Sequence, residues 1–169
     1  MFFQIGEKVV YPNQGVATVE NISMRSFGIQ SERFYLLRLV ANSLTVMVPF
    51  SHVGDIGLRK VTRNGQVGKM LDFLSAGKCK CCGDWKNRFK INAEKMRCGD
   101  LLEVAEVLKS LLVIQLSKPL SFREKKMLDR ARHMLITELS ISRGISEEEA
   151  IRMLDRALLR ASLSLPSAL

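Results

Sequence analysis

The first sixty residues alternate short apolar runs with turn residues. Four runs are rich in β-branched and aromatic residues, and they read EKVVYP, GVATVENI, RFYLLRLV and LTVMVP. Turn residues at positions 13–15, 26–28 and 41–43 separate them. Within residues 34–39 and 44–49 apolar and polar positions alternate, as in a strand with one packed and one wet face. The pattern predicts a small, bent sheet or barrel of four or five strands.

From about residue 64 the apolar positions recur at helical spacing. One stripe runs from Val67 to Leu74 and stops at Gly77. Three later segments each begin with a polar residue that is followed, three positions on, by glutamate, which is typical of a helix start. Gly144 is expected to end the second of these helices, and the tail Ser162–Leu169 is expected to fray. The paired residues are Asp100 with Glu103, Ser121 with Glu124, and Ser146 with Glu149.

These patterns predict an α+β protein in three parts. Residues 1–60 form a small β domain, residues 61–80 a helical connector, and residues 81–165 an all-helical bundle. The content of 47% apolar and 25% charged residues is typical of a folded, soluble chain. No apolar run approaches the roughly 20 residues that cross a bilayer, and the first residues lack the pattern of a signal peptide. We therefore expect a cytoplasmic protein that does not use a membrane.

The positive charge of the chain is concentrated in one segment. Residues 78–97 hold seven Lys or Arg against two acidic residues, within a chain whose net charge is +9. A localised basic patch favours a polyanionic partner, because each cation laid against a phosphate releases condensed counterions. The alternative is an ordinary solvated helix face.

The only tryptophan, Trp85, stands at the edge of this basic segment. If it begins a helix that runs through Lys95, then Trp85, Phe89 and Asn92 share one side of that helix. Tryptophan is commonly a core anchor, but the neighbouring cations disfavour burial. An exposed aromatic ring among cations suits nucleic acid, where the cations hold phosphates and the ring stacks on or wedges between bases. The neighbouring cations are Lys86, Arg88 and Lys90.

The cysteines and histidines do not form a convincing reactive or metal site. The cysteine spacing is C-x-C-C followed by one distant cysteine, which is not the paired C-x-x-C of a zinc site. Free thiols in a reducing cytosol are the preferred interpretation, and no cofactor is expected. His52 and His133 lie in unrelated segments without a nucleophile or metal ligand at local spacing, so we do not expect an enzyme. The four cysteines are Cys79, Cys81, Cys82 and Cys98.

An ordered set of short motifs extends over nearly the whole chain. It comprises FQIGEKVVYP with the following GV, LTVMVP, VG with GLR, Trp85 with RFK, GD through VAEV, and LS with EKKML, AR and EL in residues 120–139. In this order the motifs resemble the CarD/CdnL family of bacterial transcription regulators. The resemblance implies a Tudor-like β domain that binds the β subunit of RNA polymerase, and a helical domain that binds promoter DNA.

The resemblance also implies site residues. In the family a tryptophan of the helical domain wedges into the minor groove at the upstream fork of the transcription bubble, and Trp85 matches it. Lys86, Arg88 and Lys90 are then expected to contact the DNA backbone. On the polymerase-facing side Arg25 matches a family arginine, whereas Met47 stands where relatives carry a basic residue. A wedge that prefers melted DNA would stabilise the open complex.

Two alternatives stay open from the sequence. A polymerase-binding adaptor would need only residues 1 to about 60 and would make no use of Trp85. A zinc-dependent nucleic-acid module would need the cysteines and would lose its helical domain on chelation. The regulator needs both the β domain and Trp85, and we expect it to act as a monomer.

Overall fold

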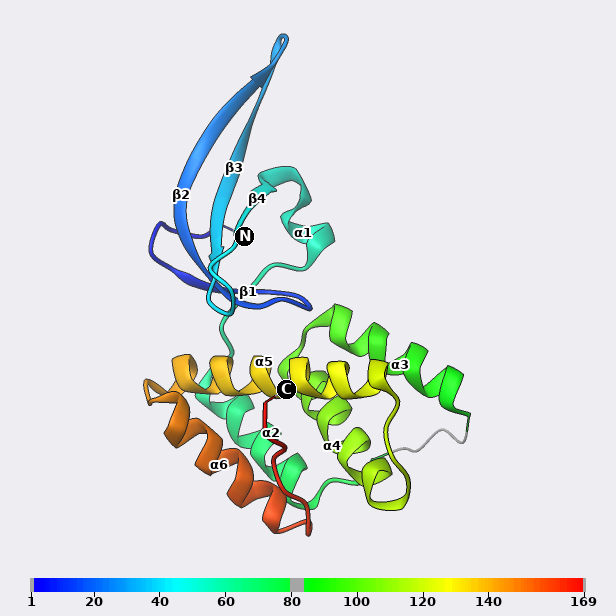
Figure 1. The fold of residues 1–169 in the computed structure, drawn as a ribbon. Coiled ribbons are helices and arrows are strands. Elements are labelled where there is room, and N and C mark those ends of the chain that lie inside the picture. Colours follow the sequence, from blue (N-terminus) through cyan, green and yellow to red (C-terminus); the bar gives the residue numbers. More distant parts are fainter. Residues whose placement is uncertain (1, 80–83, 169) are drawn as a thin grey trace. The chain divides into compact units, whose positions relative to one another are not determined.

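The computed structural model describes residues 2–79 and 84–168, with the side chain of Trp85 outside the description. The chain divides into two compact units, Met1–Val61 and Thr62–Leu169 (Figure 1). The first unit is built on a sheet and the second on helices, so the predicted α+β class is confirmed.

The first unit is a five-stranded antiparallel sheet in the order β4-β3-β2-β1-β5. Strands β1 to β4 match the four predicted runs. Strands β2 and β3 are longer than expected, because they pair out to Phe27 and Gln30. A short 3-10 turn, η1 (Phe50–His52), and one helical turn, α1 (Val53–Ile56), follow β4. The strands are β1 (Lys8–Tyr11), β2 (Gly15–Phe27), β3 (Gln30–Leu39), β4 (Thr45–Pro49) and β5 (Arg59–Lys60).

One face of this sheet is packed, as the alternation predicts. Tyr35, Leu37 and Leu39 of β3 are buried on it. The Tyr35 hydroxyl accepts a hydrogen bond from the Phe3 backbone at 3.0 Å, and its ring stacks on Phe50 with the centroids 4.1 Å apart. The residues after β4 therefore cover the inner face, and the outer face carries the alternate positions of each strand.

The second unit is a bundle of five helices around one apolar core. Helix α4 is buried along most of its length, and the buried Lys109 within it donates to the carbonyl oxygens of Phe73 and Gly77 at 2.8 and 2.6 Å. This amine adds a donor to the carbonyls at the end of α2, where the last turn of a helix leaves carbonyl oxygens without intrahelical partners. The helices are α2 (Asn64–Ala76), α3 (Trp85–Cys98), α4 (Leu101–Ser117), α5 (Phe122–Arg143) and α6 (Glu147–Leu159). Among the described residues, no helix is both long and apolar enough to cross a membrane.

The helix ends follow the sequence signals closely. Ser121 and Ser146 each form a complete capping box at the start of α5 and α6, as predicted. Gly144 ends α5 with a φ of 64°, where a left-handed backbone favours glycine. Asp100 does precede α4, but its side chain makes no capping hydrogen bond.

The residues expected to connect the two domains belong largely to the helical unit. Val67, Met70 and Leu74 of α2 are fully buried in the same core as α4 and α5. The boundary between the units therefore falls at Val61, and not across residues 61–80. The apolar stripe of α2 predicts a packed face, and in the structure this face packs in the core shared with α4 and α5.

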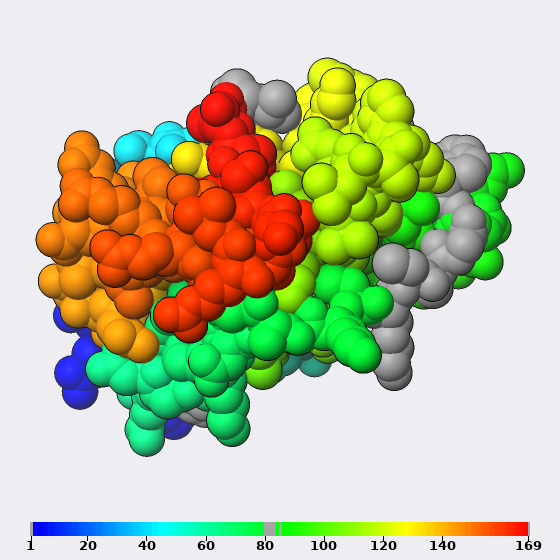
Figure 2. Space-filling model, turned by 90° about the horizontal axis from the view of Figure 1, so that it is seen from below, coloured from blue at the N-terminus to red at the C-terminus, as the bar shows by residue number. Residues whose placement is uncertain are grey.

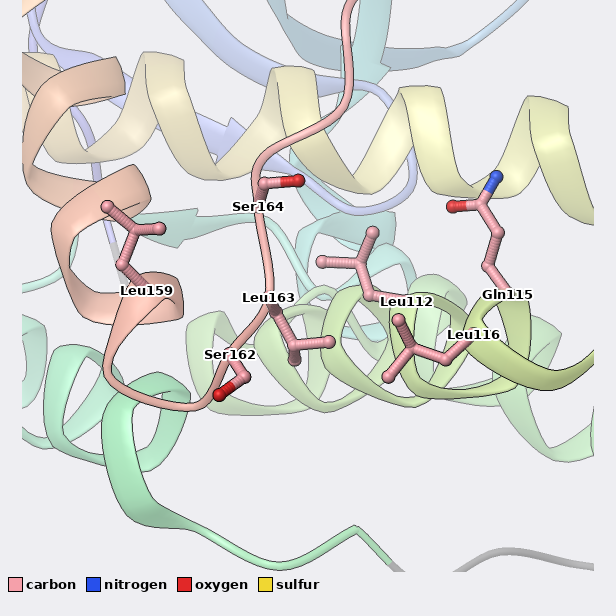
Figure 3. Close-up of a pocket in the computed structure, with 7 residues that line it drawn as sticks. All are labelled: Leu112, Gln115, Leu116, Leu159, Ser162, Leu163 and Ser164. Atoms are coloured by element: carbon pink, nitrogen blue, oxygen red, sulfur yellow. The ribbon is translucent and has the colours of Figure 1, made fainter.

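The C-terminal tail is held in place from Leu163 to Pro166, so the expectation that it frays is wrong for these residues. Leu163 is buried, the Leu165 backbone donates to Asp155 at 3.0 Å, and the Pro166 carbonyl accepts from Arg132 at 2.7 Å. In Figure 2 the tail, coloured red, lies on the surface formed by α6 and α4. A groove of about 310 Å³ runs beside it, and Figure 3 shows the side chains of α4 and the tail that line it.

A buried carboxylate fastens the start of the helical unit to α5. The Glu138 side chain accepts hydrogen bonds from the Thr62 backbone at 3.0 Å and from the Thr62 hydroxyl at 2.6 Å. The Ser142 hydroxyl donates to the Thr62 carbonyl at 2.5 Å. Because Lys60 pairs within the sheet, Val61 is the one residue between the last strand and this clamp.

We expect Glu138→Ala to lower the free energy of unfolding of the helical unit by about 2–4 kcal/mol, because it removes the buried carboxylate that accepts hydrogen bonds from the backbone and the hydroxyl of Thr62. Urea unfolding followed by tryptophan fluorescence measures it, since Trp85 belongs to this unit. The control is Glu94→Ala, which removes an exposed pair with Arg97 and should cost no more than about 0.5 kcal/mol. Equal losses in the two variants would show that the clamp contributes little.

Candidate functional site

The N-terminal turn of α3 carries the candidate wedge. Trp85 is the first residue of this helix, and Asp84 caps it by accepting a hydrogen bond from the Lys86 backbone at 3.2 Å. The helix predicted from Trp85 through Lys95 is confirmed and extends to Cys98. A helix start is an electropositive end that favours anions, so the backbone adds to the charge of the neighbouring side chains.

Arg88 is not an exposed cation. It is 7% exposed, and its Nη2 and Nε donate to Oε1 of Glu124 on α5 at 2.7 and 3.2 Å. The other oxygen of Glu124 accepts from the backbone and hydroxyl of Ser121 at 3.1 and 3.3 Å. Little of the Arg88 side chain is therefore available to a DNA backbone, and its contact with DNA stays a prediction. Its partner lies 36 residues away in the sequence, so the basic run gave no sign of it.

The other residues of α3 divide between its inner and outer sides. Phe89 is half-buried, and the Arg123 guanidinium lies 5.1 Å from the centre of its ring. Asn92 is buried, and its Nδ2 has no hydrogen-bond partner in the described part of the chain. The predicted shared side of Phe89 and Asn92 is therefore turned toward the helical core.

The cations at the far end of the basic run are engaged locally. Arg97 pairs with Glu94 at 2.6 Å, which raises the pKa of the Arg97 guanidinium, and Lys95 pairs with Glu106. Lys86 and Lys90, near the start of α3, are exposed. The charge that α3 presents is thus concentrated at its N-terminal end, beside Trp85.

The first turn of α5 extends this cationic surface. The Arg88–Glu124 pair and the Arg123–Phe89 contact hold the starts of α3 and α5 together. Phe122 is 70% exposed, with the Lys126 ammonium 4.7 Å from its ring centre. The sequence marked this segment only as a helix start, although three of residues 123–126 are cations. We call this the α3–α5 surface, and it comprises Lys86, Lys90, Phe122, Arg123, Lys125 and Lys126, on the turn that begins at Trp85 and on the first turn of α5.

The electrostatic state of Glu124 follows from its surroundings. Burial pushes the pKa of the carboxyl upward, but the hydrogen bond from Arg88, the backbone of Ser121 and the charge of Arg88 together outweigh burial. The pKa of Glu124 therefore lies below its ordinary value of 4.5. The carboxylate is charged at neutral pH and holds Arg88 in a charge-assisted contact.

Arg25 and Met47, the residues matched to the polymerase-facing side, lie on the same face of the sheet. Arg25 of β2 stands opposite Glu32 of β3, and Met47 of β4 stands opposite Leu36 of β3. Glu32 and Leu36 are four residues apart on one strand, so both point to one face, opposite to buried Tyr35. Strand β4 is at the edge of the sheet, and on this outer face Arg25 is exposed and Met47 is half-buried.

The histidines and cysteines that were considered as reactive or metal sites do not gather into one cluster in the described residues. His52 is exposed and contacts only its neighbour Ser51, at 3.1 Å, among the hydrogen bonds described. His133 has a buried Nε2 without a hydrogen-bond partner in the described residues. Cys98 is exposed and Cys79 is half-buried, while the cysteines at positions 81 and 82 lie outside the described residues. Within the described ranges no three His, Cys, Asp or Glu residues gather as metal ligands would.

We expect Arg88→Met to destabilise the helical unit by about 3–5 kcal/mol, because it leaves the Glu124 charge buried without a partner. Lys90→Met, on the exposed side of the same helix, should change the stability by less than about 0.5 kcal/mol. Adding Glu124→Gln to Arg88→Met should recover part of the loss. Urea unfolding monitored by tryptophan fluorescence decides this, and similar losses for both single variants would contradict the role of the ion pair.

The pH dependence of the same unit should reflect Glu124. Because its pKa is lower in the folded state than in the unfolded state, its contribution to stability is complete above the unfolded value of 4.5. That contribution is lost as the pH falls through the folded pKa. Unfolding midpoints measured between pH 7 and pH 3 should therefore fall more steeply for the wild type than for Glu124→Gln. Parallel curves would mean that another group controls the acid sensitivity.

Comparison with known proteins assigns the two units to one family. Residues 3–62 match the family model of the CarD-like/TRCF RID domain, and residues 69–155 match that of the CarD C-terminal domain. The chain is 35% identical over 147 residues to "Putative transcription factor YdeB" of Bacillus subtilis (strain 168), and the alignment covers 87% of this chain and 96% of that protein. The resemblance seen in the sequence is confirmed: the chain belongs to the CarD family of transcription factors.

Proposed function

We propose that this chain binds the β subunit of RNA polymerase through its first unit and promoter DNA through its second. Trp85 then wedges into the minor groove at the upstream fork of the bubble and stabilises the open complex. Transcription regulation itself follows from the family. The observation that supports the finer proposal is the start of α3, where Trp85 is the first helical residue and Lys86 and Lys90 are exposed.

The cations of this surface suit a DNA backbone. Lys86 and Lys90 on α3 are exposed, as are Arg123, Lys125 and Lys126 on α5. Cations from two helices that a buried ion pair holds together keep a defined spacing, which suits the regular spacing of phosphates. We assign Arg88 a positioning role, since it fixes the turn that carries Trp85. The phosphate contacts then fall to the exposed lysines and to the cations of α5.

The wedge provides the preference for melted DNA. Inserting an apolar ring between base pairs costs a few kcal/mol of unstacking in intact duplex, and less where the duplex is already open. A ligand shifts an equilibrium only by its differential affinity for the two states. A difference of about 1.4 kcal/mol would change the ratio of open to closed complexes tenfold. No covalent chemistry is needed for this effect.

Binding of the first unit to polymerase would bring the helical unit to promoters. Backbone and cation contacts with DNA are tolerant of sequence, so the DNA surface alone would not select promoters. Binding to polymerase raises the local concentration of the helical unit near the bubble. The free edge of β4 suits addition of a strand from the polymerase, because main-chain hydrogen bonds would carry that contact. Met47 then offers an apolar side chain where relatives carry a charge.

The adaptor alternative receives less support from the structure. An adaptor that needs only residues 1 to about 60 leaves the α3–α5 surface, with its exposed cations and the exposed ring of Phe122, without a role. The zinc alternative depends on cysteines of which two lie outside the described residues. Neither alternative accounts for the position of Trp85 at the start of α3.

We expect the wild type to prolong the lifetime of open complexes formed by the cognate polymerase on a ribosomal RNA promoter. Trp85→Ala should lose at least about tenfold of that effect, equivalent to about 1.4 kcal/mol, while its affinity for polymerase stays the same. The lifetime is measured by the decay of open complexes after a competitor is added, at several salt concentrations, because phosphate contacts weaken with salt.

Two comparisons make this experiment decisive. Trp85→Phe keeps an aromatic ring and should retain part of the effect, whereas Leu159→Ala changes an exposed residue of α6 and should retain all of it. If Trp85→Ala prolongs the lifetime as well as the wild type does, the wedge is excluded. The adaptor interpretation would then be preferred.

A further inference from the structure

A shallow pocket lies between α2 and α6, apart from the α3–α5 surface. The two helices contact each other along the bundle, and Figure 2 shows them side by side, α6 in orange and α2 in green. Helix α3 packs instead on α4 and α5, so the pocket shares no residue with the α3–α5 surface. The pocket is lined from α2 by Leu71, Asp72 and Ser75, and from α6 by Met153, Arg156, Ala157 and Arg160.

The floor of this pocket is apolar and only partly covered. Ala157 is buried, whereas Leu71 and Met153 pack against the helical core and are half-buried. The volume of about 190 Å³ lies below the roughly 300–1,000 Å³ that is typical of small-molecule sites. A recess of this size suits one or two apolar side chains presented by another protein better than it suits a whole small molecule.

The rim of the pocket carries two guanidinium groups that are not neutralised within the described part of the chain. Arg156 and Arg160 are exposed, and neither forms an ion pair with another described residue. The neighbouring Asp155 is engaged elsewhere, because it accepts a hydrogen bond from the tail backbone at 3.0 Å. Against the two cations the lining holds one carboxylate, Asp72 on the α2 side. The rim is therefore net positive and suits an acidic partner.

The spacing of the two arginines indicates the geometry of that partner. Arg156 and Arg160 are four residues apart on α6, so their side chains leave the same face of the helix one turn apart. A helix that carries two glutamates four positions apart presents its carboxylates at the matching spacing, and an apolar residue beside them can enter the recess. Arginine binds carboxylates through paired, charge-assisted hydrogen bonds. An amphipathic helix laid in an apolar groove is a recurrent mode of recognition.

We propose that the pocket between α2 and α6 docks an acidic amphipathic helix of a protein partner. Arg156 and Arg160 hold the carboxylates of this helix, and one of its apolar side chains fills the recess over Leu71 and Met153. The inference goes beyond the proposed function and does not depend on it, because none of these residues belongs to the sheet unit or to the α3–α5 surface. The chain would thereby have a third contact, separate from those proposed for polymerase and for DNA.

The test uses the full chain and a synthetic peptide of about 16 residues, which is long enough to form a helix. Its glutamates stand four positions apart beside leucines, and binding is followed by amide chemical shifts in two-dimensional NMR spectra. We expect the shifts to move for residues of α2 and α6 around the pocket. A second peptide, with every glutamate replaced by glutamine, should bind about fivefold more weakly, because it lacks two exposed ion pairs.

Protein variants provide the matched comparison. Arg156→Gln together with Arg160→Gln should bind the glutamate peptide about fivefold more weakly than the wild type does, and should bind the glutamine peptide equally well. The control is Lys118→Gln together with Arg143→Gln, which removes the same charge from exposed positions elsewhere in the unit and should leave the affinity unchanged. Because all four residues are exposed, neither double variant should disturb the fold.

Several results would overturn the inference. One is the absence of binding at about 1 mM peptide, the concentration at which even a weak contact is detected. Another is a shift pattern confined to the α3–α5 surface. An equal loss of affinity in the control variant would show that only overall charge attracts the peptide. A short DNA duplex is titrated in parallel, and if the pocket variant loses affinity for DNA but not for the peptide, the two arginines belong to a nucleic-acid surface instead.

Discussion

The buried ion pair between Arg88 and Glu124 is the contact on which the proposed DNA surface depends. Helix α3 is mostly polar, and of its apolar residues only Met96 is deeply buried among those described. Its first turn is held to α5 by this pair and by the stacking of Arg123 on Phe89. Because the loss of either partner would leave a buried charge without compensation, the pair favours the arrangement in which the two helix starts meet. It holds the first turn of α3, which begins at Trp85, against α5.

The two units carry their proposed contact surfaces on different kinds of secondary structure. The sheet packs one face, and the proposed polymerase contacts lie on its other face and on the edge strand β4. The bundle encloses α4, and the proposed DNA surface lies at the starts of α3 and α5. In both units the proposed contacts are carried by regular secondary structure rather than by long loops, and a site on such elements is held with greater geometric accuracy.

Local signals in the sequence were sufficient for most of the fold but not for the site. Capping boxes at Ser121 and Ser146 and the alternation in β3 act within a few residues, and they predicted their elements correctly. The two-residue strand β5 is too short to leave a periodic pattern, and the anchoring of the tail depends on side chains of α5 and α6. Arg88 was grouped with the exposed cations because its partner is distant in sequence. Pairings of that kind are set by packing, which composition and spacing do not encode.

The clamp at Thr62 and the anchored tail have a consequence for the order of folding during synthesis. The sheet unit is complete by residue 61, so it can form while the helices are still being translated, as domains generally do. The packing of the helical unit includes late residues, because Leu163 is buried in its core and Arg132 donates to the Pro166 carbonyl. This packing is therefore completed only after the tail has been translated. Until then the growing chain exposes apolar helix surface, which is the condition that makes incomplete chains prone to aggregation.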